Sequence, residues 1–292
     1  MIQLTRALIL LLFGSGAFAT DQGVIDRTIP QPSTGPANAP PAQTGKHPQT
    51  RLPWVAIVID DMGNNETDRQ AVLLPGPIAY AFLPHTPYAV ELALLAARNG
   101  KEVLLHQPMQ SSADNNPGPG ALLLEMDQRT FRDTFSKNLA ALPYVSGINN
   151  HMGSLLTRHQ QPMQWLMAEL QRYPSLFFLD SRTTAQTVAY QNAEDHHIPS
   201  SSRDVFLDNQ LHPEALLAQF QQLITIARKQ GSAIAIGHPY PQTIAFLREH
   251  LPDLKRAGID LRAVSDIIDL RQPALRTAWQ RSAPAASNHQ QN

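Results

Sequence analysis

The stretch from Val55 to Gly63, Val-Ala-Ile-Val-Ile-Asp-Asp-Met-Gly, places two adjacent carboxylates directly after an apolar run. A short apolar run that ends at turn-forming residues is typical of a buried β-strand. Adjacent carboxylates repel each other and are costly unless a cation, a proton or fixed donors stabilise them. Two interpretations are therefore open for Asp60 and Asp61: an acidic turn, or a chemical site at the end of a strand.

Further apolar runs resemble the first, and helical patterns separate them. Strand and helix alternate about eight times, which predicts a single α/β domain with a (β/α)7–8, TIM-like barrel, closed or nearly so. An open doubly wound sheet is the alternative. We expect strands at Val55–Ile59, Ile78–Phe82, Glu102–Leu105, Val145–Ile148, Leu176–Leu179, Val205–Leu207, Ala233–Ile236 and Arg262–Val264.

Two of the intervening segments carry apolar stripes at helical spacing, which we expect to pack against the core. Asp127 and Pro213 stand where such helices would begin. The stripes are Phe131, Phe135 and Leu139 in one segment, and Leu216, Phe220, Leu223 and Ala227 in the other.

The ends of the chain differ in composition from its middle. Residues 1–19 predict a cleavable signal peptide, with Arg6 before an apolar segment and Ala17-Phe18-Ala19 as a cleavage site. The apolar segment is too short to span ~30 Å of hydrocarbon, so we expect no membrane span after cleavage. Residues 20–52 predict a disordered Pro-rich linker and residues 272–292 a disordered tail, which leaves 53–271 as the folded domain.

Composition limits the chemistry that is available. The 23 Lys and Arg residues nearly balance the 24 Asp and Glu residues, and no basic run predicts a nucleic-acid partner. The chain has no cysteine, so it forms no disulfide, and any metal must be bound by His, Asp or Glu. The signal peptide predicts export, and a bacterial periplasm fits both features.

Five of the expected strands end in an aspartate or a histidine, and in a parallel barrel such ends meet at one face. Asp61, His106 and His151 offer one carboxylate and two imidazoles for a divalent metal, and zinc is the expected ion. Asp60 is then free to act as the base that deprotonates bound water. We expect its carboxyl to stay ionised near neutral pH, because a cation lies beside it.

Other polar residues near the same strand ends have open roles. His238 follows Ala233–Ile236 and is predicted to be a general acid, an oxyanion partner or a structural donor. Asp180 and Arg182 are candidates to orient His238, to bind substrate hydroxyls or to form a structural salt bridge. Asn150, which flanks His151, is a further candidate for substrate binding or orientation.

These motifs resemble those of the divergent polysaccharide deacetylases, relatives of the enzymes that deacetylate chitooligosaccharides or peptidoglycan. The resemblance covers about 54–266. It rests on Val58–Gly63, Leu105–Met109, Gly147–Ser154, Phe178–Ser181 and Ile236–Pro239.

In the active deacetylases the first Asp of the pair acts as base and the second binds metal, and Asp60 and Asp61 match these positions. His106 matches the first metal histidine of that family, and Gln110 stands where the second would be. His238 approximates the histidine of the closing Leu-x-His motif, and the arginine-containing motif has no match.

The resemblance implies a metal-dependent N- or O-deacetylase that acts on an envelope carbohydrate such as peptidoglycan. The alternative is an inactive barrel that binds glycan or an envelope protein partner, and Gln110 and the missing arginine motif favour it. A glycosidase is a third option, but it requires carboxylates about 5–10 Å apart, which an adjacent pair does not supply.

Overall fold

A computed structural model describes residues 51–113 and 115–275. The expected signal peptide (1–19) and most of the expected linker (20–52) and tail (272–292) lie outside these residues, so those assignments stay predictions. Within the two described ranges, no helix is long and apolar enough to cross a membrane.

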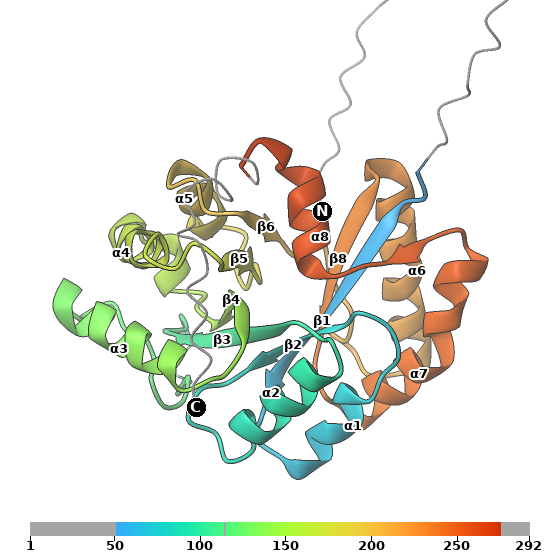
Figure 1. Ribbon diagram of the computed structural model, residues 1–292, viewed down its shortest axis with the longest axis horizontal. Helices are drawn as coiled ribbons and strands as arrows, with labels where there is room; N and C mark the ends of the chain where they lie inside the picture. The colour runs from blue at the N-terminus through green and yellow to red at the C-terminus, as the bar shows by residue number, and fades with distance from the viewer. Residues whose placement is uncertain (1–50, 114, 276–292) are drawn as a thin grey trace, which may run out of the picture. The chain divides into compact units, whose positions relative to one another are not determined.

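The domain is built on one parallel sheet that curls around a central axis (Figure 1). Its strand order is β6-β5-β4-β3-β2-β1-β8-β7, with β9 paired to β1. This order follows the chain around the sheet, as in an α/β barrel and unlike a doubly wound sheet. The strands are β1 (Trp54–Met62), β2 (Ala79–Phe82), β3 (Val103–Met109), β4 (Val145–Met152), β5 (Phe177–Asp180), β6 (Ser200–Ser202), β7 (Val205–Phe206), β8 (Ser232–Gly237) and β9 (Asp260–Leu261).

Two strands differ from the sequence prediction. The strand expected at Arg262–Val264 is wrong: β9 ends at Leu261, and Val264 begins a helix. The half-buried Glu102 carboxylate accepts hydrogen bonds from the backbone N–H groups of Val264 and Ser265, which favours a helix start there. Strand β6 was not predicted, because its three serines carry no apolar signal.

The barrel comes closest to closing at the segment from Ser200 to Phe206. At its start β6 pairs with β5, and at its end β7 pairs with β8. Between them, Arg203 N–H donates to the Asp180 carbonyl on one edge and Asp204 N–H donates to the Ile234 carbonyl on the other. One short segment therefore bridges both edges of the sheet, which gives the incompletely closed barrel that the strand alternation predicts.

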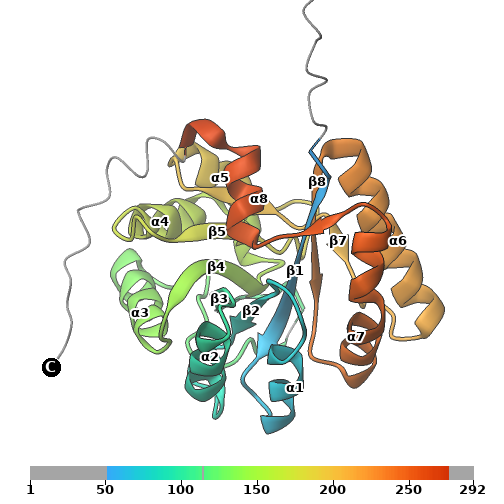
Figure 2. The same ribbon diagram turned by 45° about the vertical axis from the view of Figure 1, so that its right-hand side comes forward.

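Helices surround the outside of the sheet (Figures 1 and 2). Both predicted stripes are helical and largely buried: α3 begins after Asp127, which accepts a hydrogen bond from Thr130 N–H, and α6 begins at Pro213. The helices are α1 (Arg69–Val72), α2 (Ala89–Arg98), α3 (Gln128–Ala140), α4 (Gln160–Leu170), α5 (Ala189–Asp195), α6 (Pro213–Gln230), α7 (Pro241–Arg256) and α8 (Val264–Arg271), with 3-10 turns η1 (Glu66–Asp68) and η2 (Leu156–Arg158).

The interior of the barrel is apolar at one end and polar at the other. Alternate residues of β1, Ala56 and Val58, belong to an inner cluster that also contains Ile267 and Ile268 of α8. Helix α8 thus closes the amino end of the barrel. Because side chains alternate along a strand, the next inward residue of β1 is Asp60, at the opposite, carboxyl end.

Candidate active site

A backbone irregularity in β1 brings two adjacent carboxylates to the same pocket. Neighbouring residues of a regular strand point to opposite faces. Here the register shifts between Ile59 and Met62, and Asp61 takes a left-handed conformation with φ of 58°. A non-glycine residue in this region is strained, and such strain is typical of functional sites. Asp60 therefore faces the barrel interior while Asp61 also lines the pocket at its mouth.

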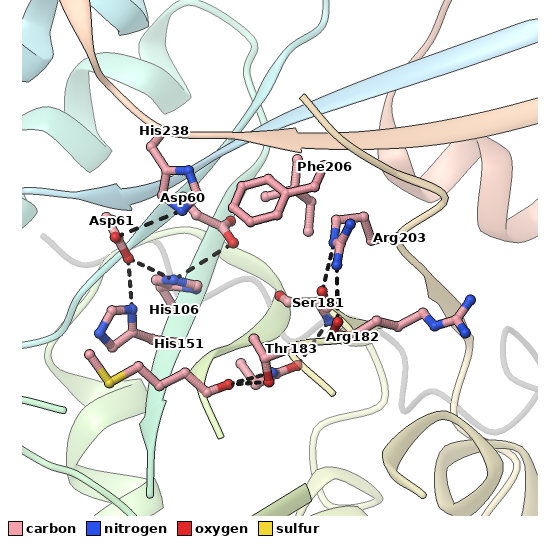
Figure 3. A pocket seen from close by; sticks show the side chains of 13 residues that line it. Asp60, Asp61, His106, His151, Ser181, Arg182, Thr183, Arg203, Phe206 and His238 are labelled. Carbon is pink, nitrogen blue, oxygen red and sulfur yellow. Dashed lines mark hydrogen bonds and ion pairs between the residues drawn. The ribbon is translucent and has the colours of Figure 1, made fainter. Parts of the chain in front are cut away.

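Three potential metal ligands converge at this mouth (Figure 3). Asp61 Oδ1 lies 3.0 Å from His106 Nε2 and 2.7 Å from His151 Nδ1, and the three ligand atoms lie within 4.8 Å of one another. His106 comes from β3 and His151 from β4, which pair directly. The structure thus brings together the three residues that the sequence nominated.

These residues fit a divalent cation. Asp61 Oδ1 is buried, yet it has no hydrogen-bond partner among the described residues, although two ring nitrogens lie close to it. One carboxylate oxygen and two imidazole nitrogens are a donor set that zinc accepts while leaving positions open. Burial opposes ionisation of Asp61, but the closeness of the His106 and His151 rings outweighs it and lowers the pKa of that carboxyl.

Asn149 of β4 fixes the orientation of His106 from behind. Its side-chain Nδ2 lies 2.7 Å from Asp60 Oδ1, and because a carboxylate only accepts, this nitrogen is the donor. The other amide atom, Oδ1, then accepts from His106 Nδ1, 2.8 Å away. His106 Nδ1 therefore carries a proton, and Nε2 on the Asp61 side is the ring nitrogen that could bind a metal.

Asp60 lies beside the three ligands and is almost fully buried. Its Oδ2 atom is 3.7 Å from His106 Nε2. Burial raises the pKa of Asp60, and the charges of His106 and His238 only partly oppose this effect. A raised pKa suits a carboxylate that must accept a proton near neutral pH.

His238 approaches the same site from the end of β8, and its partner is Asp208. His238 Nδ1 lies 2.9 Å from Asp208 Oδ1, and the His238 backbone N–H donates to Asp208 Oδ2. The opposite ring nitrogen, Nε2, lies 3.9 Å from Asp61 Oδ2 and so faces the pocket. Burial lowers the pKa of His238, but the hydrogen bond and charge of Asp208 outweigh it and raise the pKa to about 9.

Asp208 was missed from the sequence, and Asp180 does not take its place. Asp180 accepts hydrogen bonds from the Arg182 N–H and the Thr187 hydroxyl, both at 2.8 Å, so it holds the loop after β5 rather than orienting His238. Asp208 directly follows the expected strand Val205–Leu207. The same strand-end rule that selected the other residues would therefore have found it.

The remaining candidates lie on the rim of the pocket. Asn150 Oδ1 accepts from Ser181 N–H and Nδ2 donates to the Met152 carbonyl, so its amide joins the ends of β4 and β5. Arg182 is exposed and has a φ of 49°. The cavity of about 380 Å³ is lined by Asp60, Asp61, His106, Asn150, His151, Met152, Ser181, Arg182, Thr183, Arg203, Phe206, Ile236 and His238.

Gln110 lies outside the ligand cluster and has a structural contact of its own. Its side-chain Oε1 accepts a hydrogen bond of 2.7 Å from Leu124 N–H, and its carbonyl accepts from Leu155 and Leu156 N–H. Gln110 thus joins the loop that follows β3 to the turn that follows β4. The imidazole beside Asp61 and His106 comes instead from His151 of β4.

Comparison with known proteins identifies a family for the chain. Residues 57–268 match the model of the divergent polysaccharide deacetylases. The chain belongs to this family. Escherichia coli K12 YibQ, an uncharacterized protein, is 36% identical over 233 residues, which cover 80% of this chain and 72% of YibQ. An uncharacterized protein of Haemophilus influenzae is 39% identical over 201 residues, 68% of this chain and 71% of that protein.

A solved structure shares the fold. The crystal structure of an uncharacterized protein from Agrobacterium tumefaciens C58 superimposes with a TM-score of 0.72 at 26% identity. The match covers 75% of this chain and 90% of the other. The barrel is therefore shared over almost the whole length of that relative.

Proposed function

We propose that this protein is a metal-dependent hydrolase that removes acyl groups from a carbohydrate, most simply an N- or O-deacetylase. One observation carries the proposal: His106 and His151 converge on Asp61 Oδ1, a buried carboxylate oxygen that lacks a hydrogen bond among the described residues. Family membership supports a carbohydrate substrate.

Asp60 is the proposed proton acceptor. When bound, a divalent cation, for which we propose zinc, would polarise the acyl carbonyl and lower the pKa of water. The hydrogen bond from Asn149 holds the Asp60 carboxylate in place, and its raised pKa favours proton uptake. The proton then moves to Asp60 from the attacking water.

His238 is the proposed proton donor to the leaving amine or alcohol. Its pKa of about 9 keeps the ring protonated near neutral pH. Asp208 holds Nδ1, so the proton available to substrate is the one on Nε2, which faces the pocket. Base and acid therefore act from neighbouring strands, β1 and β8.

The proposed location is the bacterial periplasm, and the proposed substrate is peptidoglycan or another envelope glycan. Both follow from the export signal expected in residues 1–19. Fractionation of cells that express the full chain tests the first. Acetate release from a panel of N- and O-acetylated glycans tests the second.

Metal analysis of the purified protein is the first test. We expect about one divalent ion per chain, because residues 51–113 and 115–275 contain one such three-ligand cluster. His106→Ala and His151→Ala should each release it. His250→Ala, on α7 and outside the pocket, is the matched control and should retain it. Stoichiometric metal in both ligand variants would overturn the ligand assignment.

Acetate release from the glycan panel is the second test. Asp60→Asn should reduce the rate by about 10²–10⁴-fold, the usual contribution of a general base. The variant should keep its metal, because Asp60 is not one of the three ligands. No acetate from any glycan, with metal fully bound, would instead favour a barrel that binds glycan or an envelope protein.

A further inference from the structure

Arg203 is a fixed cation on the wall of the pocket away from the metal ligands (Figure 3). Its Nε donates to the Ser181 carbonyl at 2.7 Å and its Nη2 to the Arg182 carbonyl at 3.0 Å. The guanidinium carbon lies 5.0 Å from the ring centre of Phe206, which also lines the pocket. A guanidinium has five N–H donors; two of them are used here, so three are left for a ligand.

Among the described residues, no carboxylate lies within ion-pair distance of this cation, although the charges of Asp60, Asp180 and Asp204 act on it from farther away. Across residues 51–113 and 115–275, no ion pair within 4.0 Å includes Arg203. The side chain is half-buried, and burial lowers its pKa, although an arginine stays charged in proteins. A half-buried charge with no direct ion pair is costly, and a ligand that supplies the opposite charge at close range would reduce that cost.

The charge balance of the pocket points the same way. A divalent cation would neutralise the Asp60 and Asp61 carboxylates, and His238 is paired with Asp208. Arg203 and the exposed Arg182 line the same cavity, and the Asp180 carboxylate, whose charge acts on both of them, offsets only one of their two charges. The occupied pocket would carry net positive charge on its arginine side.

We infer that Arg203 binds an anionic group of the substrate, so that the glycan is an acidic one whose carboxylate sits on Arg203 while its acyl group lies at the metal ligands. Arg182 contributes a second, weaker contact from the rim. This inference rests on the proposed function, because it names the substrate class of that site. Arginine suits the role, since its planar fork matches a carboxylate geometrically.

A matched pair of ligands tests it. The acidic ligand is a tetrasaccharide of alternating N-acetylglucosamine and glucuronic acid, and the neutral one is its carboxyl-reduced form. Binding is measured by calorimetry on metal-loaded full-length protein with Asp60→Asn, which blocks turnover. We expect the acidic form to bind about ten- to a hundredfold more tightly, the usual value of a hydrogen bond to a charged group.

The variants separate recognition from folding. Arg203→Gln should abolish the preference, and Arg203→Lys, which keeps the charge, should retain part of it. Arg228→Gln is the matched control: Arg228 also donates to a backbone carbonyl, that of Ala257, but lies on α6 outside the pocket. If Arg203→Gln fails to fold, Arg203→Lys and Arg182→Gln still test the site, and each should reduce the preference.

Equal affinity for the two forms, no binding of the acidic form, or a preference that survives Arg203→Gln would overturn the inference. Its failure is distinguishable from that of the proposed function. If the wild-type protein releases acetate from both forms and the Asp60→Asn protein binds both with equal affinity, the proposed hydrolase stands and the anion site is refuted. If the acidic form binds selectively but the wild-type protein releases acetate from no glycan, the anion site stands and the proposed hydrolase is refuted.

Discussion

At the amino end of the barrel the half-buried Glu102 carboxylate accepts backbone N–H bonds from Val264 and Ser265, whereas at the carboxyl end Asp61 Oδ1 is buried without a hydrogen bond among the described residues. Both groups lie within one parallel sheet. The first is satisfied by the fold itself, because a helix N-terminus supplies its donors. Asp61 Oδ1 is instead flanked by His106 and His151, whose imidazole side chains are common metal ligands.

This difference separates a structural carboxylate from a functional one. Glu102 stabilises the start of α8, which plugs the barrel, and its environment needs nothing further. Asp61 sits in a strained conformation beside two histidines and needs a cation or protons to complete it. Substitutions at the carboxyl end should therefore change ligand binding and rate, and substitutions at the amino end should change stability alone.

The largest expected effect comes from Asn149. Asn149→Leu removes the acceptor that fixes the His106 tautomer, and loss of such a partner typically weakens metal binding about 10–100-fold. Asn149→Asp keeps an acceptor for His106 Nδ1–H but loses the donor to Asp60, so metal should stay while acetate release falls. Competition with a chelator measures the affinity, and nitrogen-15 shifts of the metal-free protein report the His106 tautomer.

A matched control distinguishes this role from general packing. Asn192 is another buried amide, bonded to Gln160 and to the Val188 carbonyl, and it lies on α5 away from the pocket. Asn192→Leu should reduce stability and leave metal affinity unchanged. Unchanged affinity in Asn149→Leu would refute the positioning role of that amide.

Much of the barrel and part of the site could be predicted from the sequence, because apolar runs mark the strands and polar residues mark their ends. Asp60, Asp61, His106, His151 and His238 all follow such runs, and the structure gathers them in one pocket. Contacts across the sheet were not predictable in this way. Asn149 contacts His106 on the neighbouring strand β3, and Arg203 donates to the backbone of the loop after β5. The three serines of β6 pair with β5 although they carry no apolar pattern.

An intermediate effect is expected from Asp208→Asn, which removes the charge that holds the pKa of His238 at about 9. Burial would then be opposed only by the charges of Asp60 and Asp61, so the pKa of His238 should fall. Since the proposed acid must be protonated, the alkaline limb of the rate profile should move to lower pH, with about a tenfold loss or more at pH 8. Asp180→Asn is the control and should leave the alkaline limb at its wild-type pH. If the limb moves in Asp180→Asn and stays in place in Asp208→Asn, Asp180 rather than Asp208 is the partner of His238.

The smallest effect tests the amino end, through the pH dependence of stability. Burial raises the pKa of Glu102 above its ordinary value of 4.5, and the hydrogen bonds from Ser265 and Val264 only partly oppose this. The folded chain therefore binds this proton more tightly than the unfolded chain. Stability from this group is greatest below the unfolded pKa and falls as pH rises from about 4.5 through the folded pKa.

Glu102→Gln removes the titration and keeps one acceptor for the α8 amides. The difference in unfolding free energy between wild type and variant should fall with rising pH, by at most about 1.4 kcal/mol per pH unit for a single group. Urea unfolding at several pH values above 4.5 measures it, and metal content at neutral pH should be the same in both proteins. A difference in unfolding free energy that does not change with pH would refute the titration of Glu102. A loss of metal in Glu102→Gln would show that the carboxylate at the amino end also affects the site at the carboxyl end.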